Sequence, residues 1–483
     1  MIFVILVAAV LFRIIALNQS LWLDEAININ NAIALDFKTL ILNYSLGDFH
    51  PPLYHAILKG WIIISEPLTR FIDSEAVFRI PSIIFGVLTV FVTYLIAKKL
   101  YEKKTALIAA TLMATAPLHI YYSQEARMYA LAAFLASASV YFFISLVKKD
   151  TLGNWVGFMI STTLMLYSDY LPYLLLPTYV LFLFINRKRI PPGTLKSFVP
   201  AYVLVFILLI PWLLIFPDQI KGGLSAASST PAWAKVVGST DAKSFVITFV
   251  KFTIGRISHD NNLIYALIFA PVALYISFLS ALSILRQTSA RSFLWFWFAV
   301  PIIAAFVLSF FIPVFAYFRL LFVLPALYII LASAINIVNW PKLTRILLLL
   351  ALAINMTAAT IYFTNPKFHR EHWKEAVSFV SANSSPTSVA LFEAGSSMAP
   401  FDFYNNGQIE AKGAINGLNA KPEEVEVKVK EATKGKTKVF LFQYLTQITD
   451  PQGLVFKELS RQGFVNTGTK DFSGVGFVYV FEK

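Results

Sequence analysis

The chain has 483 residues, of which 57% are hydrophobic and only 14% are charged, with a net charge of +13 and no cysteine. Soluble domains usually carry about 25% charged and 45–50% apolar residues, so a soluble chain this apolar could not cover its surface with polar groups. The composition therefore indicates a membrane protein, and the missing cysteines exclude disulfides, thiolate metal sites and cysteine nucleophiles.

The positive charge could in principle attract the phosphates of a nucleic acid. The basic residues fall mainly between apolar runs, however, where the loops of a membrane protein are expected. We therefore expect membrane lipids, and no nucleic acid, as partners of this charge.

A helix needs about 20 apolar residues to cross the hydrocarbon core of a bilayer. By this criterion the sequence predicts a polytopic α-helical membrane protein with about 11 spans. They lie near 1–17, 80–97, 105–121, 128–147, 153–168, 171–185, 198–217, 263–285, 292–312, 318–337 and 344–363. The first run lacks a basic start and a clear cleavage site, so we interpret it as a retained anchor.

The short loops show a strong charge asymmetry. One side carries most of their basic residues, whereas the short loops of the other side hold only Arg127 and Arg319. Because basic loops stay in the cytoplasm, we expect a multi-pass protein of the plasma membrane with a cytoplasmic N-terminus. Three longer segments, 18–79, 218–262 and 364–483, are then extracytoplasmic.

The tail, 364–483, differs in character from the transmembrane domain, 1–363. Strand-like runs at 388–392, 438–443 and 476–481 alternate with helix-like segments near 370–382, 421–433 and 451–462. This pattern predicts a small extracytoplasmic α/β domain.

Two adjacent carboxylates, Asp24 and Glu25, follow the first span. Successive side chains on a helix point about 100° apart, so we expect different roles for the two acids. A nearby like charge and a dry wall would both raise the pKa of a carboxyl toward that of a useful base. Alternatively, both acids complement the dipole of a helix N-terminus.

The same outer segment contains Asp48 and then His50-Pro51-Pro52 and His55. Prolines are common in the first turn of a helix, which favours a helix start at His50. His50 is a candidate metal ligand or a donor to phosphate, although a purely structural role is the alternative.

Glu125, Arg127 and Tyr129 lie between the third and fourth spans, on the same predicted side as Asp24. Arg319 precedes the tenth span, where a guanidinium group can hold a phosphate with two hydrogen bonds. The alternatives are an exposed ion pair, worth little on its own, and arginines that reach the lipid phosphates. The sequence has no Walker loop, no GxGxxG before a soluble βα unit and no HExxH motif, so ATP is not expected to power the protein.

Several of these motifs occur together in one known family. Arg13, Leu21-Trp22-Leu23-Asp24-Glu25-Ala26, His50-Pro51-Pro52-Leu53-Tyr54, Arg79-Ile80-Pro81-Ser82 and the run from Tyr121 to Ala130 resemble the dolichyl-phosphate-mannose-protein mannosyltransferases of the GT-C superfamily. That superfamily also includes the lipid A aminoarabinose transferases. The resemblance is strongest over 10–150, continues more loosely to Arg319 and Pro325, and does not cover the tail specifically.

The resemblance implies transfer of a sugar, with inversion, from a polyprenyl-phosphate donor to a hydroxyl of a protein, lipid or glycan acceptor outside the cytoplasm. It implies Asp24 as the catalytic base and Glu125 as a second catalytic acid. The second acid is Glu where some relatives have Asp, which leaves its role open. Arg127 and Arg319 would bind the donor phosphate. The substrate-binding set is completed by Glu25, His50 and Tyr129. Some relatives use a divalent metal, for which Glu25, His50 and Glu125 are the candidate ligands.

Two other interpretations remain open from the residues alone. A lipid or sugar transporter would have repeats and broken helices at mid-membrane, and the sequence shows neither feature. A non-catalytic membrane scaffold would use the tail as a glycan-binding module.

Overall fold

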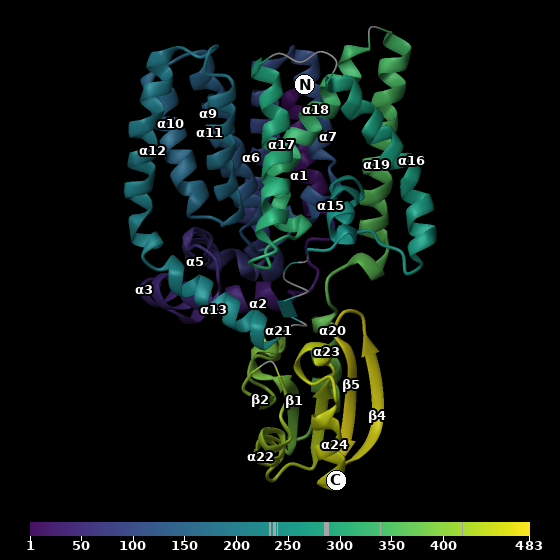
Figure 1. Cartoon of the computed structure of the whole chain (residues 1–483). Coiled ribbons are helices and arrows are strands. Elements are labelled where there is room, and N and C mark those ends of the chain that lie inside the picture. The colour runs from purple at the N-terminus through teal and green to yellow at the C-terminus, as the bar shows by residue number, and fades with distance from the viewer. Residues whose placement is uncertain (231–232, 235–237, 239, 285–288, 339, 418) are drawn as a thin grey trace.

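The structure is a computed structural model that describes residues 1–230, 233–234, 238, 240–284, 289–338, 340–417 and 419–483. Part of the second predicted outer segment, 218–262, therefore lies outside the described residues. A helical bundle forms one end of the molecule and a sheet-containing domain forms the other, with the N-terminus in the bundle and the C-terminus in that domain (Figure 1).

The bundle has helices at every position predicted for a span. Among the described residues, seven helical segments are long and apolar enough to cross a membrane. They are α6 (Ser74–Leu100), α9 (Tyr129–Lys148), α12 (Pro192–Leu213), α16 (Asn262–Ile284), α17 (Ser289–Leu308), η4 with α18 (Tyr317–Val323 and Leu324–Ile337) and α19 (Pro341–Thr364). The shorter apolar helices are α1 (Ile2–Ile14), α10 (Leu152–Leu166) and η3 with α11 (Leu171–Leu174 and Leu175–Ile185).

The predicted third span is broken. Helix α7 (Lys103–Ala114) and helix α8 (Pro117–Ser123) meet at an angle of 59°. Pro117 is the first residue of α8, and a proline has no N–H to continue the hydrogen bonds of the preceding helix. The bend places α8 and the loop after it beside the candidate site.

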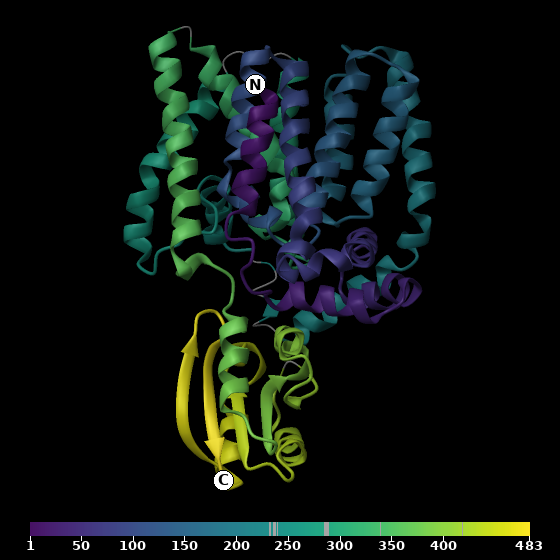
Figure 2. The ribbon, with the colours of Figure 1, turned by 180° about the vertical axis from the view of Figure 1, so that it is seen from behind.

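Short helices lie between the bundle and the sheet domain, roughly across the direction of the spans (Figures 1 and 2). They are α2 (Leu23–Ala34), α3 (Phe37–Thr39), η1 (Leu40–Tyr44), α4 (Ser45–Gly47), α5 (Leu53–Ser65), η2 (Glu66–Arg70) and α13 (Phe216–Ser229). Helix α5 begins three residues later than predicted, because His50-Pro51-Pro52 form the turn before it. Helix α15 (Ala242–Ile254) packs against α8, η4 and α19.

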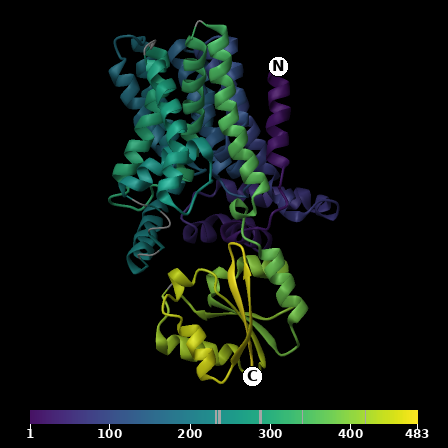
Figure 3. The same cartoon turned by 90° about the vertical axis from the view of Figure 1, so that its right-hand side faces the viewer.

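The sheet domain has five strands in the order β2-β1-β3-β5-β4 (Figure 3). Strand β1 pairs in parallel with β2 and β3, whereas β5 pairs in antiparallel with β3 and β4. The strands are β1 (Ser388–Ala394), β2 (Ala411–Ile415), β3 (Lys438–Phe442), β4 (Val465–Phe472) and β5 (Gly476–Glu482). The sequence predicted β1, β3 and β5 and missed β2 and β4.

Helices cover both faces of this sheet. Helix α20 (Trp373–Asn383) and helix α21 (Ala399–Asn405) pack on one face, and α22 (Pro422–Ala432) and α24 (Leu454–Arg461) pack on the other. The short segments η5 (Pro366–Phe368), η6 (Gly395–Ser397) and α23 (Thr446–Thr449) complete the chain. Because successive side chains of a strand point to opposite faces, Ala390 and Phe392 join the first core while Val389 and Leu391 join the second.

The sheet domain packs directly on α2 and on the start of α6. Leu21 N donates to Tyr404 Oη at 2.8 Å, and Asn30 Nδ2 donates to the Ala399 carbonyl at 3.0 Å. Phe78 and Phe403 meet edge to face with centroids 6.2 Å apart. These contacts fix α2, the helix that carries Asp24 and Glu25, between the bundle and the sheet domain.

Candidate functional site

Glu25 and Arg79 form a buried ion pair that ties α2 to α6. Arg79 Nε donates to Glu25 Oε1 at 2.8 Å and Nη2 donates to Oε2 at 2.7 Å. Arg79 also donates to three main-chain carbonyls in the segment 17–20, and Ala126 N donates to Glu25 Oε1 at 2.8 Å. Burial opposes ionisation of Glu25, but the charges of Arg79 and Arg370 lower the pKa of this carboxyl.

The prediction of Glu25 as a substrate or metal ligand is therefore corrected. Its side chain is fully buried, and both carboxylate oxygens bond to Arg79. Neither oxygen is exposed to a substrate or an ion, which leaves Glu25 a structural role.

Glu125 forms a second buried ion pair, with Arg370. Arg370 Nη1 lies 3.0 Å from Glu125 Oε2, and its Nη2 donates to the carbonyls of Gln124 at 3.0 Å and Tyr121 at 3.3 Å. Arg370 Nε lies 3.8 Å from Glu25 Oε2, so the two pairs form one network of two acids and two arginines. Glu125 Oε1 is buried and accepts no hydrogen bond from the described residues. A catalytic role for Glu125 stays a prediction.

Asp24 lies on the exposed side of this network. Its Oδ2 is 3.4 Å from Arg127 Nη2, and Arg127 Nη1 is 3.8 Å from Asp48 Oδ1. The side chain of Asp24 is 37% exposed, whereas that of Arg127 is 4% exposed. A buried cation thus orients an acid that solvent can reach.

Asp48 contacts both histidines of the first outer segment. Its Oδ2 lies 3.0 Å from His50 Nδ1 and 3.1 Å from His55 Nε2. Burial alone would raise the pKa of Asp48, but the charge of His50 and the hydrogen bonds from both rings hold it well below its usual range. The structure therefore gives His50 an acid partner two residues away, and its predicted substrate contact stays a prediction.

Tyr129 is the common neighbour of the predicted site residues. The charges of Arg127, Glu125, Arg319 and Asp24 all act on its hydroxyl group. Its ring is buried and lies 5.4 Å from that of Phe318, beside Arg319. The structure thus places residues from α2, from the loop before α9 and from η4 near one another, and their roles in a common site stay a prediction.

Two arginines reach the site without an acid partner. Arg319 lies over the ring of Phe318 at 5.9 Å, and its buried Nε has no hydrogen-bond acceptor in the described part of the chain. Arg256, which the sequence analysis did not single out, donates to Tyr121 Oη and lies 4.7 Å from the centre of that ring. Neither arginine forms an ion pair with any described residue.

The sequence analysis also missed Glu371, on the segment that leads into the sheet domain. Trp373 Nε1 donates to its Oε2 at 2.7 Å, and Tyr444 Oη lies 2.9 Å from Oε1 and 3.0 Å from Oε2. Burial raises the pKa of Glu371 to about 7; the charge of Asp24 also raises it, while the two hydrogen bonds and Arg256 lower it. The segment before the sheet domain thus contributes a buried acid that two side chains of this domain hold in place.

The candidate metal ligands do not come together. No group of three His, Asp or Glu side chains suited to a metal ion occurs among the described residues. Glu25 and Glu125 are engaged by arginines and His50 by Asp48. These three residues therefore do not fit the possible divalent metal.

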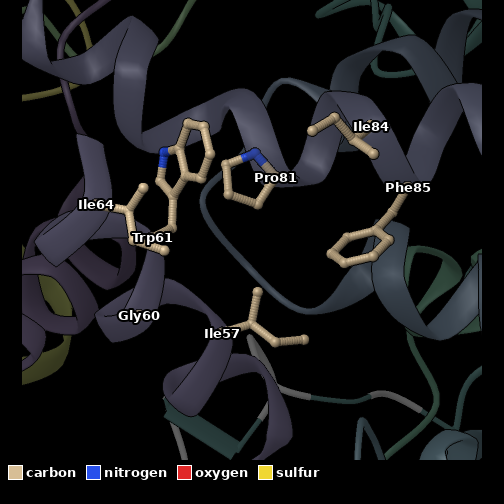
Figure 4. Close-up of a pocket in the computed structure, with 7 residues that line it drawn as sticks. All are labelled: Ile57, Gly60, Trp61, Ile64, Pro81, Ile84 and Phe85. Atoms are coloured by element: carbon tan, nitrogen blue, oxygen red, sulfur yellow. The ribbon is translucent and has the colours of Figure 1, made fainter. Parts of the chain in front are cut away.

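An apolar groove of about 350 Å³ lies between α5 and α6, close to the site (Figure 4). Tyr54 and Ser82, whose hydroxyl groups are 3.2 Å apart, link the same two helices, and Ser82 Oγ donates to the Arg127 carbonyl. Ile64 and Ile84 are strongly exposed, so the groove opens outward. It is lined by Ile57, Gly60, Trp61, Ile64, Pro81, Ile84 and Phe85.

Comparison with known proteins gives one family and one fold. The family model for dolichyl-phosphate-mannose-protein mannosyltransferase matches residues 50–215. No curated protein matches the chain by sequence. ArnT from Cupriavidus metallidurans, solved with undecaprenyl phosphate, is similar in structure with a TM-score of 0.62 and 12% identity, over 99% of this chain and 97% of ArnT.

A second similar structure is the oligosaccharyltransferase AglB from Archaeoglobus fulgidus, solved with an inhibitory peptide and a dolichol-phosphate. It has a TM-score of 0.56 and 13% identity, over 99% of this chain and 74% of AglB. The family match over residues 50–215 and the fold shared with ArnT and AglB make the chain similar to the integral membrane glycosyltransferases of the GT-C superfamily.

Proposed function

We propose that this protein transfers a sugar from a polyprenyl-phosphate donor to an acceptor hydroxyl, with inversion, at the extracytoplasmic membrane face. The observation that carries the proposal is the pairing of an exposed acid, Asp24, with a buried arginine, Arg127, beside two arginines that have no acid partner. This arrangement provides a base for a hydroxyl group and cations for a phosphate.

In the proposed reaction, Asp24 accepts the proton of the acceptor hydroxyl as its oxygen attacks the anomeric carbon. The bond from that carbon to the phosphate oxygen breaks, and the electron pair leaves with the polyprenyl phosphate. Arg256 and Arg319 stabilise the negative charge that develops on this leaving group. Attack from the side opposite the phosphate inverts the anomeric centre.

The groove between α5 and α6 supports a lipid-linked donor. Its lining is apolar and it opens outward, and Ser82, which follows the lining residue Pro81, donates to the Arg127 carbonyl. An isoprenoid chain in this groove would keep its phosphate at the membrane surface, near the arginines. Undecaprenyl phosphate and dolichol-phosphate in the two similar structures support the same class of donor.

The charge of the loops supports the proposed orientation. Helix α6 ends with Lys98 and Lys99, and α7 begins with Lys103 and Lys104. This junction lies at the end of the bundle away from the sheet domain (Figures 1 and 2). Basic loops remain in the cytoplasm. The site and the sheet domain would therefore lie outside.

The test uses membrane vesicles from cells that overproduce the protein, supplied with polyprenyl-phosphate donors that carry a radiolabelled sugar. Wild type should place label in a covalent product, and Asp24→Asn should lower the rate about 10²–10⁴-fold, the usual contribution of a positioned base. Asp36→Asn, an exposed cap of α3, is the matched control and should leave the rate unchanged. Label that only crosses the membrane, or normal transfer by Asp24→Asn, would refute the proposal.

A further inference from the structure

Glu371 belongs to the segment that joins the membrane bundle to the sheet domain, and both parts fix its position. On the bundle side, the preceding Arg370 N donates to Gln19 Oε1 at 2.8 Å. On the domain side, His372 N donates to the Ser473 carbonyl at 2.9 Å. Glu371 therefore cannot shift unless one of these two anchors breaks.

The turn between β4 and β5 packs closely against Glu371. Gly474 in this turn has φ +78°, and a Cβ at this position would lie 2.9 Å from both Cα and Cγ of Glu371. The left-handed backbone and the close approach both require glycine. The turn therefore packs against the base of the Glu371 side chain.

The hydrogen-bond donors to Glu371 are themselves rigid and neutral. Trp373 is fully buried, and its ring lies 5.8 Å from that of Phe442 and 4.9 Å from that of Tyr444. Glu371 forms no ion pair with any described residue, although a buried carboxylate is costly unless it is compensated. The side-chain oxygen of glutamine could accept both of these hydrogen bonds, so the two neutral donors alone do not require an acid at this position.

Two contacts place Glu371 beside the residues of the proposed reaction. Leu23, the neighbour of Asp24, packs against the core that contains Trp373 and Tyr444, and Arg370, the neighbour of Glu371, donates to the same Tyr121 hydroxyl group as Arg256. In the proposed reaction, Asp24 holds the acceptor hydroxyl and Arg256 holds the phosphate. The anomeric carbon lies between those two groups. Glu371, whose two neighbours in space and sequence adjoin Asp24 and Arg256, therefore lies near the position proposed for the transferred sugar.

We propose that Glu371 recognises the transferred sugar by accepting hydrogen bonds from its hydroxyl groups, with Tyr444 and Trp373 as positioning residues. This inference rests on the proposed function. A carboxylate has about four lone-pair directions, and Trp373 and Tyr444 occupy only part of them. Because the pKa of Glu371 is about 7, a large share of this side chain is ionised at neutral pH and above. Hydrogen bonds to the ionised acceptor are roughly twice as strong as neutral ones, an advantage that glutamine would lack. The sheet domain thus helps to select the sugar.

The test compares two probes on the full-length protein in lipid nanodiscs. One is undecaprenyl phosphate, and the other is the member of a panel of undecaprenyl-phosphate hexoses and pentoses that wild type binds most tightly. Glu371→Gln should weaken binding of the sugar-bearing probe about tenfold or more, as expected for a hydrogen bond to a charged group, and change binding of undecaprenyl phosphate less than twofold. Arg256→Gln should weaken binding of both probes.

Controls separate recognition from folding. Glu375→Gln, an exposed acid on α20, should leave both affinities unchanged, and Tyr444→Phe should weaken the sugar-bearing probe selectively. The role of Glu371 would be overturned if Glu371→Gln lost affinity equally for both probes or lost none. It would also be overturned if wild type bound no sugar-bearing probe more tightly than undecaprenyl phosphate. A wild type that does not bind undecaprenyl phosphate at all would overturn the proposed function itself.

Discussion

Replacing the adjacent acids Asp24 and Glu25 should produce opposite defects. Glu25 is fully buried and bonds through both oxygens to Arg79. Glu25→Gln removes the negative charge and leaves Arg79 without an ion pair. Removing one partner of a buried ion pair typically costs about 3–5 kcal/mol, because the remaining charge is uncompensated.

The structure places the expected loss near the lower end of this range, about 3 kcal/mol. Arg79 keeps hydrogen bonds to three carbonyls in the segment 17–20, so part of its charge stays solvated by the main chain. Asp24 is 37% exposed and meets Arg127 at 3.4 Å. Arg127 is buried, but in Asp24→Asn it keeps a second carboxylate, Asp48, at 3.8 Å. The partly exposed pair should therefore contribute only about 1 kcal/mol or less, and Asp24→Asn should leave the stability nearly unchanged.

The assay is thermal unfolding of detergent-purified protein followed by tryptophan fluorescence, combined with the transfer measurement. Glu25→Gln should lower the yield of folded protein and the unfolding temperature, whereas Asp24→Asn should unfold like wild type and lack transfer activity. If Glu25→Gln unfolds at the wild-type temperature, the buried ion-pair network does not stabilise the fold as proposed. If Asp24→Asn loses as much stability as Glu25→Gln, its inactivity says nothing about catalysis.

Two further predictions concern the groove and Glu371. A Cβ at Gly60 meets no atom within 4 Å, so Gly60→Phe should fill the groove without disturbing the fold. Gly60→Phe should weaken binding of undecaprenyl phosphate about tenfold, the equivalent of roughly two buried methylene groups, and leave binding of the short-chain citronellyl phosphate unchanged. Gly153→Phe, where a Cβ is also unobstructed, is the control. Equal losses for both lipids in Gly60→Phe would refute the assignment of the groove. The pKa of Glu371 is about 7 in the folded protein and about 4.3 in the unfolded chain, so folding favours the protonated form. The free energy of unfolding of wild type should therefore fall relative to that of Glu371→Gln as the pH rises from about 4.3 to 7. A constant difference between the two free energies from pH 5 to pH 8 would contradict this prediction.

Hydropathy predicted the helices of the bundle because span length is a property of local sequence. The break at Pro117 was not predicted: the sequence was interpreted as having one continuous span at 105–121 and no broken helix, although proline cannot continue a helix and so carried this signal. Which carboxylate of the adjacent pair is buried depends on the face of α2 that packs inward. Glu25 shares the buried stripe with Ile29 and Ala32, at spacings of four and seven residues, so helical periodicity could have distinguished it from Asp24.

Arg256, Arg370 and Glu371 were missed for a different reason. The charge asymmetry singled out Arg127 and Arg319 because it was applied to short loops, and these three residues lie in the long outer segments. Arg370 and Glu371 follow the end of α19 by only a few residues, so the same criterion could have included them. Their contacts with Glu125 and Tyr444 are long-range, and no local pattern predicts such contacts.

The charged residues form two groups: a buried network that fixes positions, and charges that the proposed reaction uses. Glu25, Arg79, Glu125 and Arg370 form a closed, buried network with no net charge, and they come from four different elements: α2, α6, the loop before α9 and the segment before α20. Asp24 pairs with Arg127 outside this network, and Arg256 and Arg319 form no ion pair with any described residue. Preorganised charges act most strongly when surrounding groups fix their positions before the substrate arrives. Because one of the four supporting residues lies beyond the last span and its neighbour Glu371 bonds to Tyr444, the sheet domain is part of the site.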